Sequence, residues 1–260
     1  MTGGLLYNWS IWAVYAGTVA LFLLVGWCSY RLGCRKREPA DATEQSHLGI
    51  ALGGLLGLLG LLLAFTFGMA GSRFDARKAL VIEEANAIGT AYLRVDLLPE
   101  SQRAEARGLL RRYVDARLLG VQPGKMEEAI ATSLRLQNQL WSLATRAAQT
   151  SPSLMTGLYI QSVNEVIDIH TKRLTLAARN PIPTSILATL YFVTLLMLAL
   201  IGYENGRVGV RIRLAELVMV ITLATVVGLI MDLDRSAEGL LRVSQQAMLD
   251  LRDSMDRPSS

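Results

Sequence analysis

The sequence predicts an all-α integral membrane protein in which two transmembrane helical hairpins flank a four-helix extramembrane domain. Three observations lead to this prediction: four long apolar segments, a polar stretch between the second and third of them, and helical periodicity throughout that stretch. The composition agrees with it, since 52% of the 260 residues are apolar and only 18% are charged. A chain of this composition must expose part of its apolar surface to lipid.

The four apolar segments are residues 11–30, 48–70, 183–203 and 214–231. Each reaches the length of roughly 20 residues that a helix needs to cross the hydrocarbon of a bilayer. No lysine, arginine or aspartate interrupts the first three, and the fourth carries only Glu216, close enough to its start to reach the interface. Residues 1–10 hold no basic side chain and no small-x-small site follows the first segment, so we expect a retained span and not a signal peptide.

The distribution of basic residues predicts the orientation in a bacterial inner (cytoplasmic) membrane. Two short loops are rich in basic residues, at Arg31, Arg35, Lys36 and Arg37 and at Arg207, Arg211 and Arg213. Short basic loops stay in the cytoplasm, which places both termini and the helical domain on the periplasmic side. Basic residues such as Arg73 and Lys172 at the opposite ends of the spans leave the reverse orientation open.

The chain divides into four segments by composition: an N-terminal transmembrane hairpin (1–71), a helical extramembrane domain (72–180), a C-terminal transmembrane hairpin (181–232) and an amphipathic tail (233–260). Breaks at Pro99, at Pro123-Gly124 and at Ser151-Pro152 divide the domain into four helices, and the last of these is predicted to have Ser151 as its N-cap and Pro152 in its first turn. Gly71-Ser72 is a weak break, so the second span is able to continue into the domain as one long helix.

Apolar residues recur at helical spacing in the domain and in the tail, as is typical of helices that bury one narrow face. The predicted buried faces are Val81, Ala85, Ile88, Tyr92 and Val95 in the first domain helix, Ile130, Leu134, Trp141 and Ala144 in the third, Val163, Ile167 and Leu174 in the last, and Leu240, Val243, Ala247 and Leu251 in the tail. The tail is expected to lie on the interface or to pack on the domain.

The second span carries a continuous stripe of small residues: Gly49, Gly53, Gly57, Gly60, Ala64 and Gly68. Small side chains let two helix backbones approach closely, which is how helices associate in lipid. The stripe therefore predicts a helix-packing face. The partner helix belongs either to the same chain or to another subunit near an oligomer axis.

Aromatic and basic residues follow this stripe at the end of the second span. Phe65, Thr66 and Phe67 are pore or neck candidates, because a ring of aromatic side chains can form a hydrophobic constriction. The alternative is that the aromatic rings sit at the interface. Arg73 and Arg77 come next and are candidates to attract anions. The alternative for Arg73 is that it pairs with Asp75 or with lipid headgroups.

A charge group, Asp232, Asp234 and Arg235, follows the fourth span. Its carboxylates are able to bind a cation or to pair with Arg73. In the domain, His170 lies on the apolar face of the last helix, where it is either a pH switch or an interior histidine held by a hydrogen bond. Glu83 and Glu84 flank the first buried face and are expected to be solvated; the alternative is a buried pair, in which burial disfavours the charged form of a carboxyl group.

Several classes of function lack sequence support. The two histidines lie far apart, the two cysteines, Cys28 and Cys34, sit together at the end of the first span, and no phosphate-binding loop or nucleophile motif occurs. We therefore predict no metal, no cofactor and no enzyme activity. The net charge of +4 is not gathered in a basic tract, which argues against nucleic acid as a partner.

Several short motifs resemble those of the bestrophin-like domain, a bacterial membrane family of unassigned function. These motifs are Arg73-Phe74-Asp75, Glu83-Glu84-Ala85, Leu97-Leu98-Pro99, Glu204-Asn205, Leu233-Asp234-Arg235 and Arg242-Val243-Ser244. The resemblance covers about 200 residues, from Leu58 onward, and departs from the family at Ser236, where proline is usual. The family is distantly similar to bestrophins, which are pentameric anion channels with a cytoplasmic helical domain.

This resemblance implies an oligomeric ion channel, more suited to anions, with the second span near the pore and Phe65 and Phe67 in its neck. It also implies a cytoplasmic domain, in conflict with the charges of the loops. The alternative function is a non-conducting membrane scaffold or sensor whose domain binds a partner or ligand. The expected partners are the lipid bilayer, further copies of the chain, and an ion or small ligand.

Overall fold

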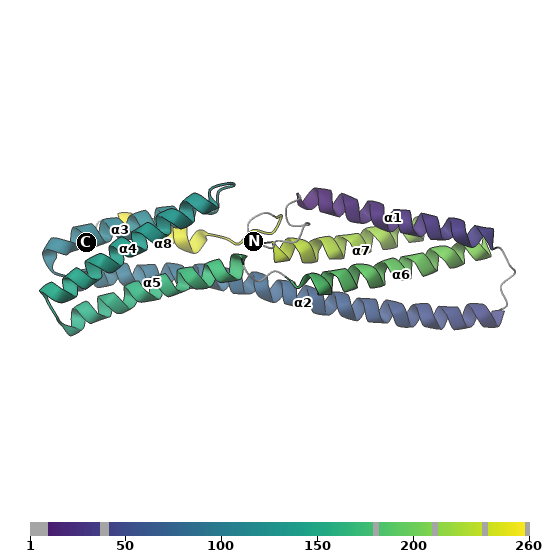
Figure 1. Cartoon of the computed structure of the whole chain (residues 1–260), viewed down its shortest axis with the longest axis horizontal. Coiled ribbons are helices and arrows are strands. Elements are labelled where there is room, and N and C mark those ends of the chain that lie inside the picture. The colour runs from purple at the N-terminus through teal and green to yellow at the C-terminus, as the bar shows by residue number, and fades with distance from the viewer. Residues whose placement is uncertain (1–9, 37–41, 179–181, 210–212, 236–238, 258–260) are drawn as a thin grey trace. The chain divides into compact units, whose positions relative to one another are not determined.

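The computed structural model describes residues 10–36, 42–178, 182–209, 213–235 and 239–257 (Figure 1). Its helices are α1 (Ile11–Arg35), α2 (Ala42–Arg94), α3 (Glu100–Leu119), α4 (Met126–Thr150), α5 (Leu154–Ala178), α6 (Thr184–Val208), α7 (Arg213–Asp234) and α8 (Gln246–Asp256), with a 3-10 turn, η2 (Val95–Leu97), after α2. The described residues contain no strand, so the predicted all-α fold is confirmed.

Four helices, α1, α2, α6 and α7, are long and apolar enough to span a membrane, and each coincides with one predicted span to within one residue or extends beyond it. The chain is thus a multi-pass membrane protein. Local signals define the ends of these helices. The Ser10 side chain accepts a hydrogen bond from the Ala13 backbone N–H at the start of α1, and Gly209 ends α6 with a φ of 77° that favours glycine.

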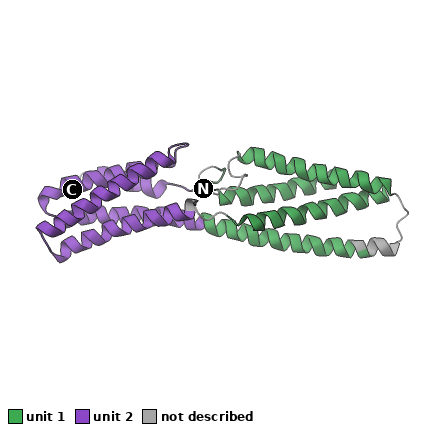
Figure 2. Ribbon diagram, in the orientation of Figure 1, with its two compact units in different colours: residues 1–74, 181–241 green, residues 75–180, 242–260 purple. Residues whose placement is uncertain are grey.

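The chain forms two compact units (Figure 2). Unit 1 comprises residues 1–74 and 181–241 and contains both hairpins, whereas unit 2 comprises residues 75–180 and 242–260. In unit 1, α1 packs against α6 and α7 around a core that includes Phe22, Met197 and Val227. Helix α2 runs through Gly71-Ser72 without a break and contributes residues to both units, as the sequence allows.

In unit 2, α3 packs against α4, and α4 packs against α5. The buried face predicted for residues 81–95 of α2 and η2 is confirmed, whereas the face predicted for α4 is only partly right, because Ala144 is buried as expected. Leu134 and Trp141 are 47% and 40% exposed, whereas Ser133 and Gln137 are buried. The buried face of α4 is mainly apolar, with Leu136, Leu140 and Leu143 beside the polar Ser133 and Gln137, and it lies farther round the helix than the prediction placed it. The start of α5 also differs, because Ser153, and not Ser151, accepts the hydrogen bond from the Thr156 backbone N–H.

The tail folds back on unit 2 as α8, which packs on α3. Met248 and Met255 are its buried residues, and Arg252 lies 2.9 Å from Asp115 of α3. The Tyr92 hydroxyl of α2 donates to the backbone oxygen of Met255. Packing on the domain is therefore the observed alternative for the tail, although Leu240 precedes α8 and is exposed.

Candidate functional site

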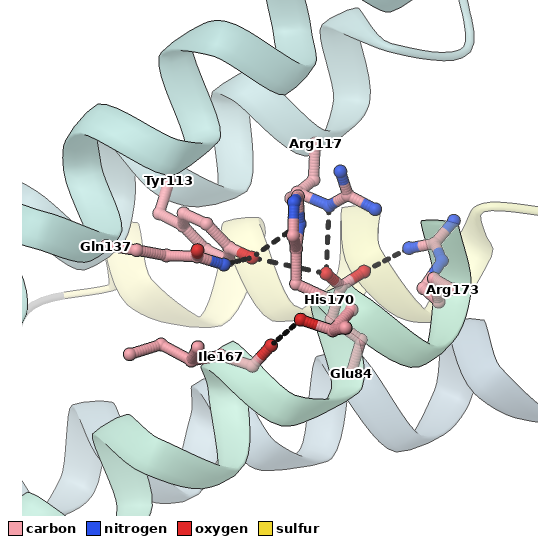
Figure 3. Close-up of polar contacts among 8 residues, drawn as sticks. Glu84, Tyr113, Arg117, Gln137, Ile167, His170 and Arg173 are labelled. Atoms are coloured by element: carbon pink, nitrogen blue, oxygen red, sulfur yellow. Dashed lines mark hydrogen bonds and ion pairs between the residues drawn. The ribbon is translucent and has the colours of Figure 1, made fainter. Parts of the chain in front are cut away.

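A fully buried carboxylate, Glu84, lies at the centre of a polar cluster in unit 2 (Figure 3). It projects from α2 toward α3 and α5. Arg117 Nε of α3 lies 2.8 Å from Glu84 Oε1, and Arg173 Nη1 of α5 donates to Glu84 Oε2. A buried charge is tolerated only where such partners compensate for lost water. The prediction of a solvated residue is therefore wrong for Glu84, while Glu83 is exposed as expected.

Three neutral side chains extend this cluster into the core. Gln137 Nε2 donates to the Tyr113 hydroxyl oxygen over 3.0 Å, and His170 Nδ1 lies 3.2 Å from the same oxygen. The hydroxyl has a single proton to share between His170 Nδ1 and Glu84 Oε1, the latter 3.4 Å away. His170 Nε2 is buried and has no hydrogen-bond partner among the residues that the structure describes.

The surroundings determine the charge states in this cluster. Burial, reinforced by Arg117 and Arg173 and opposed by Glu84, lowers the pKa of His170 to about 4. Burial and then the nearby Glu84 carboxylate raise the pKa of Tyr113 above its usual range. At neutral pH His170 is thus an uncharged interior histidine held by a hydrogen bond, which was one of the two interpretations of the sequence.

The charge group at the end of α7 is arranged around internal hydrogen bonds. Asp234 accepts from the Ile182 backbone N–H over 3.0 Å, and its Oδ1 lies 3.3 Å from Arg73 Nη1. Asp232 accepts from the backbone N–H groups of Leu240 and Leu241, each over 2.9 Å. Protein donors therefore occupy both carboxylates, and Arg73 pairs with Asp234 instead of the exposed Asp75.

Two further arginines lie in this part of the chain. Arg235 is buried, and its backbone N–H closes the last turn of α7 by donating to the Met231 oxygen. Arg77 lies on α2 in unit 2 and is half-buried. In the part of the chain that the structure covers, no group of three or more potential ligands gathers to hold a metal ion.

The three pore or neck candidates on α2 do not share one side of the helix. Phe65 is 68% exposed and Phe67 is 43% exposed, whereas Thr66 is buried and donates to the Leu62 backbone oxygen. Because a helix turns by about 100° per residue, two side chains that are two positions apart diverge widely. Phe65 and Phe67 stay predicted neck residues because both are exposed, but they point to different sides of α2, whereas Thr66 faces the interior of unit 1.

The small-residue stripe of α2 is open. All six of its members are exposed, and a Cβ added to any of its five glycines would meet no described atom within 4 Å. Only 11% of the apolar window of α2 is buried, against 33% for α6. Among the described residues, packing within the same chain therefore does not account for the stripe.

Close packing of glycines occurs instead between α1 and α6, where the sequence analysis did not expect it. A Cβ added to Gly33 would overlap the carbonyl oxygen of Tyr203, and one added to Gly206 would overlap that of Tyr30. A Cβ at Gly202 would lie 2.6 Å from the carbonyl oxygen of Gly26. The Gly202-x-x-x-Gly206 spacing was the available signal for this contact.

Comparisons with known proteins agree with this architecture. The model of the Bestrophin-like domain matches residues 16–248, which is most of the chain. The chain belongs to the bestrophin-like domain family. None of the curated proteins matches the sequence of this bestrophin-like protein.

Solved structures of bacterial bestrophin homologues share the fold. A crystal structure from Klebsiella pneumoniae is 16% identical, with a TM-score of 0.63 over 95% of this chain and 97% of the other. A mutant of the Klebsiella pneumoniae homologue gives 15% identity and a TM-score of 0.64 over 94% and 97% of the two chains. A further crystal structure, of a membrane protein, is also 15% identical, with a TM-score of 0.64 over 95% and 97%.

Sequence reasoning missed most of the Glu84 cluster of this bestrophin-like protein. Tyr113, Arg117, Gln137 and Arg173 were not singled out, although each lies three or four residues from a buried position of its own helix. Arg117, for example, follows Tyr113 by one helical turn. Charged residues at such positions are a weak signal, because most of them on a helix face water.

We expect His170 to make the bestrophin-like protein less stable in acid. The pKa of His170 is about 4 in the folded protein and near 6.5 in the unfolded chain, so the unfolded chain binds the proton first as the pH falls. Stability is complete above pH 6.5 and declines between pH 6.5 and 4, by roughly 3 kcal/mol at most. Unfolding of the detergent-solubilised protein, measured across this range, tests this.

The control is the His170→Asn variant, which keeps a polar atom near the position of Nδ1 but does not titrate. Its stability is expected to fall less steeply than that of the wild type over the same pH range. Equal slopes for the two proteins would contradict the assignment of this pH dependence to His170.

Proposed function

We propose that this bestrophin-like protein assembles into a homo-oligomeric ion channel in which α2 lies near the pore. The observation that carries the proposal is the open stripe of α2. A face of five glycines and an alanine lets another backbone approach closely, and nothing in the described part of the chain uses it. Copies of the chain around an axis would bury this face.

The ion preference that we propose is for anions. The resemblance to bestrophins supports it, and Arg73 and Arg77 near the end of the α2 span are the candidate residues that would attract anions. The ion pair of Arg73 with Asp234 compensates part of this charge. Phe65 and Phe67 are the exposed aromatic side chains that we propose for a neck.

A second candidate function is a non-conducting scaffold or sensor. It is favoured by the apolar character of the α2 span, since Thr66 faces inward and exposed leucines such as Leu58 and Leu61 cover the rest. An ion has no polar side chain to contact along such a wall.

The side of the membrane on which unit 2 lies stays a prediction. The charges of the loops predict the periplasmic side, whereas the resemblance to bestrophins predicts the cytoplasmic side.

The first experiment is to measure the mass of the complex in nanodiscs, followed by ion flux into liposomes. We expect four or more subunits and a flux above that of empty vesicles, with a reversal potential that follows the anion gradient. A Gly57→Ile variant places a branched side chain on the open face and is expected to reduce both subunit number and flux.

Gly17→Ile on α1 is the matched control, because Gly17 is also exposed and also has no atom within 4 Å of an added Cβ. It is expected to leave the oligomer intact. A monomer or dimer in nanodiscs would overturn the channel proposal. A large oligomer with no flux over a range of pH would support the scaffold instead.

A further inference from the structure

The Glu84 cluster contains more positive than negative charge. Two guanidinium groups, those of Arg117 and Arg173, share the single carboxylate of Glu84, and the other members, Tyr113 and His170, are neutral near pH 7. The Glu84 cluster therefore has a net charge of +1 in a largely buried position. Burial lowers the pKa of Arg173, the Glu84 carboxylate opposes this effect, and the nearby Arg117 adds to it.

Other ion pairs of unit 2 differ from this arrangement. Four pairs among its described residues join one arginine to one acid: Arg107–Asp96, Arg111–Asp256, Arg146–Glu105 and Arg252–Asp115. All of these side chains are at least 36% exposed, against 9% for Arg117 and 17% for Arg173. Water screens the exposed pairs, whereas the excess charge beside Glu84 is screened much less.

Both arginines keep donors that Glu84 does not use. Each guanidinium has five N–H groups, and the contacts to Glu84 involve Nε of Arg117 and Nη1 of Arg173. Figure 3 shows the terminal nitrogens of Arg117, and the second terminal nitrogen of Arg173, pointing away from the carboxylate. The side chain of Arg117 keeps 9% of its surface exposed, and that of Arg173 keeps 17%.

We propose that Arg117 and Arg173 together bind a small oxyanion of the phosphate class. A planar guanidinium matches a phosphate or carboxylate group with two parallel hydrogen bonds, and two guanidinium groups held by one carboxylate are already in place. A second anion neutralises the excess charge. The site is independent of the channel proposal, because it lies wholly within unit 2.

The test uses the full-length protein in detergent and measures binding of inorganic phosphate by calorimetry and by thermal unfolding, with chloride at equal ionic strength as the reference. Phosphate is expected to bind saturably and to raise the Tm. Arg117→Gln and Arg173→Gln should each weaken binding roughly tenfold or more. Arg146→Gln removes an exposed arginine of unit 2 and should leave binding unchanged.

The Glu84→Gln variant tests whether Arg117 and Arg173 form an anion-binding site or only a structural ion network. The change releases both guanidinium groups from their carboxylate, so phosphate should bind several-fold more tightly and stabilise this variant more than the wild type. Calorimetry on the folded fraction keeps the test valid if a variant loses stability. Arg117→Lys, which retains the charge but not the planar group, should also bind more weakly than the wild type.

Nanodiscs identify the source of the phosphate group. A gain in Tm from phosphatidic acid over phosphatidylcholine, lost in Arg173→Gln, would assign the site to a lipid phosphate, whereas a response to inorganic phosphate alone would assign it to a free ion. The proposal is overturned if neither source acts differently from chloride, or if the arginine variants respond as the wild type does.

Discussion

Replacing Glu84 with alanine is expected to lower the free energy of unfolding by about 3–5 kcal/mol. The carboxylate is fully buried and compensates two arginines of other helices, so its removal leaves two like charges facing each other with little water to screen them. The loss should appear in equilibrium unfolding in detergent, followed by circular dichroism. Because Arg117 belongs to α3 and Arg173 to α5, the variant should unfold at a lower denaturant concentration as the packing of these helices in unit 2 weakens.

The neighbouring Glu83→Ala provides the control for this prediction. Glu83 is exposed on the same helix, and a surface change of this kind usually alters stability by no more than about 0.5 kcal/mol. If both variants were equally stable, the two arginines would not depend on Glu84, and the cluster would not hold unit 2 together.

Replacing Gly206 with alanine is expected to force α1 and α6 apart and to cost about 3 kcal/mol, the upper part of the range for overpacking. An added Cβ would overlap the carbonyl oxygen of Tyr30 and lie 2.9 Å from the backbone nitrogen of Cys34. Both atoms belong to the backbone of a helix, so they cannot rotate away as the end of a side chain would.

Thermal unfolding of the purified protein, with the Gly60→Ala variant as control, tests this expectation. Gly60 also lies in a membrane span, but an added Cβ there meets no described atom within 4 Å, so alanine should leave the stability of the single chain unchanged. A Gly206→Ala protein as stable as Gly60→Ala would show that α1 and α6 do not need this close contact.

The two glycine patterns show how far sequence can predict packing. Glycines four residues apart predict that another backbone can come close, and both Gly53-x-x-x-Gly57 and Gly202-x-x-x-Gly206 have this spacing. Only the tertiary structure separates them, because the second pair contacts α1 and the first faces outward. A spacing describes one surface, and the contact depends on a second surface elsewhere in the chain.

By itself the sequence determined the spans, the helix boundaries near Pro99 and Pro123-Gly124, the all-α class and the family resemblance. These depend on local properties: apolar length, helix-breaking residues and short motifs. Only the tertiary structure decided that Glu84 is buried and that Gln137, and not Trp141, faces the core of unit 2. Glu84 and Arg173 are 89 residues apart, so the partners that make a buried charge tolerable are invisible in the sequence around it.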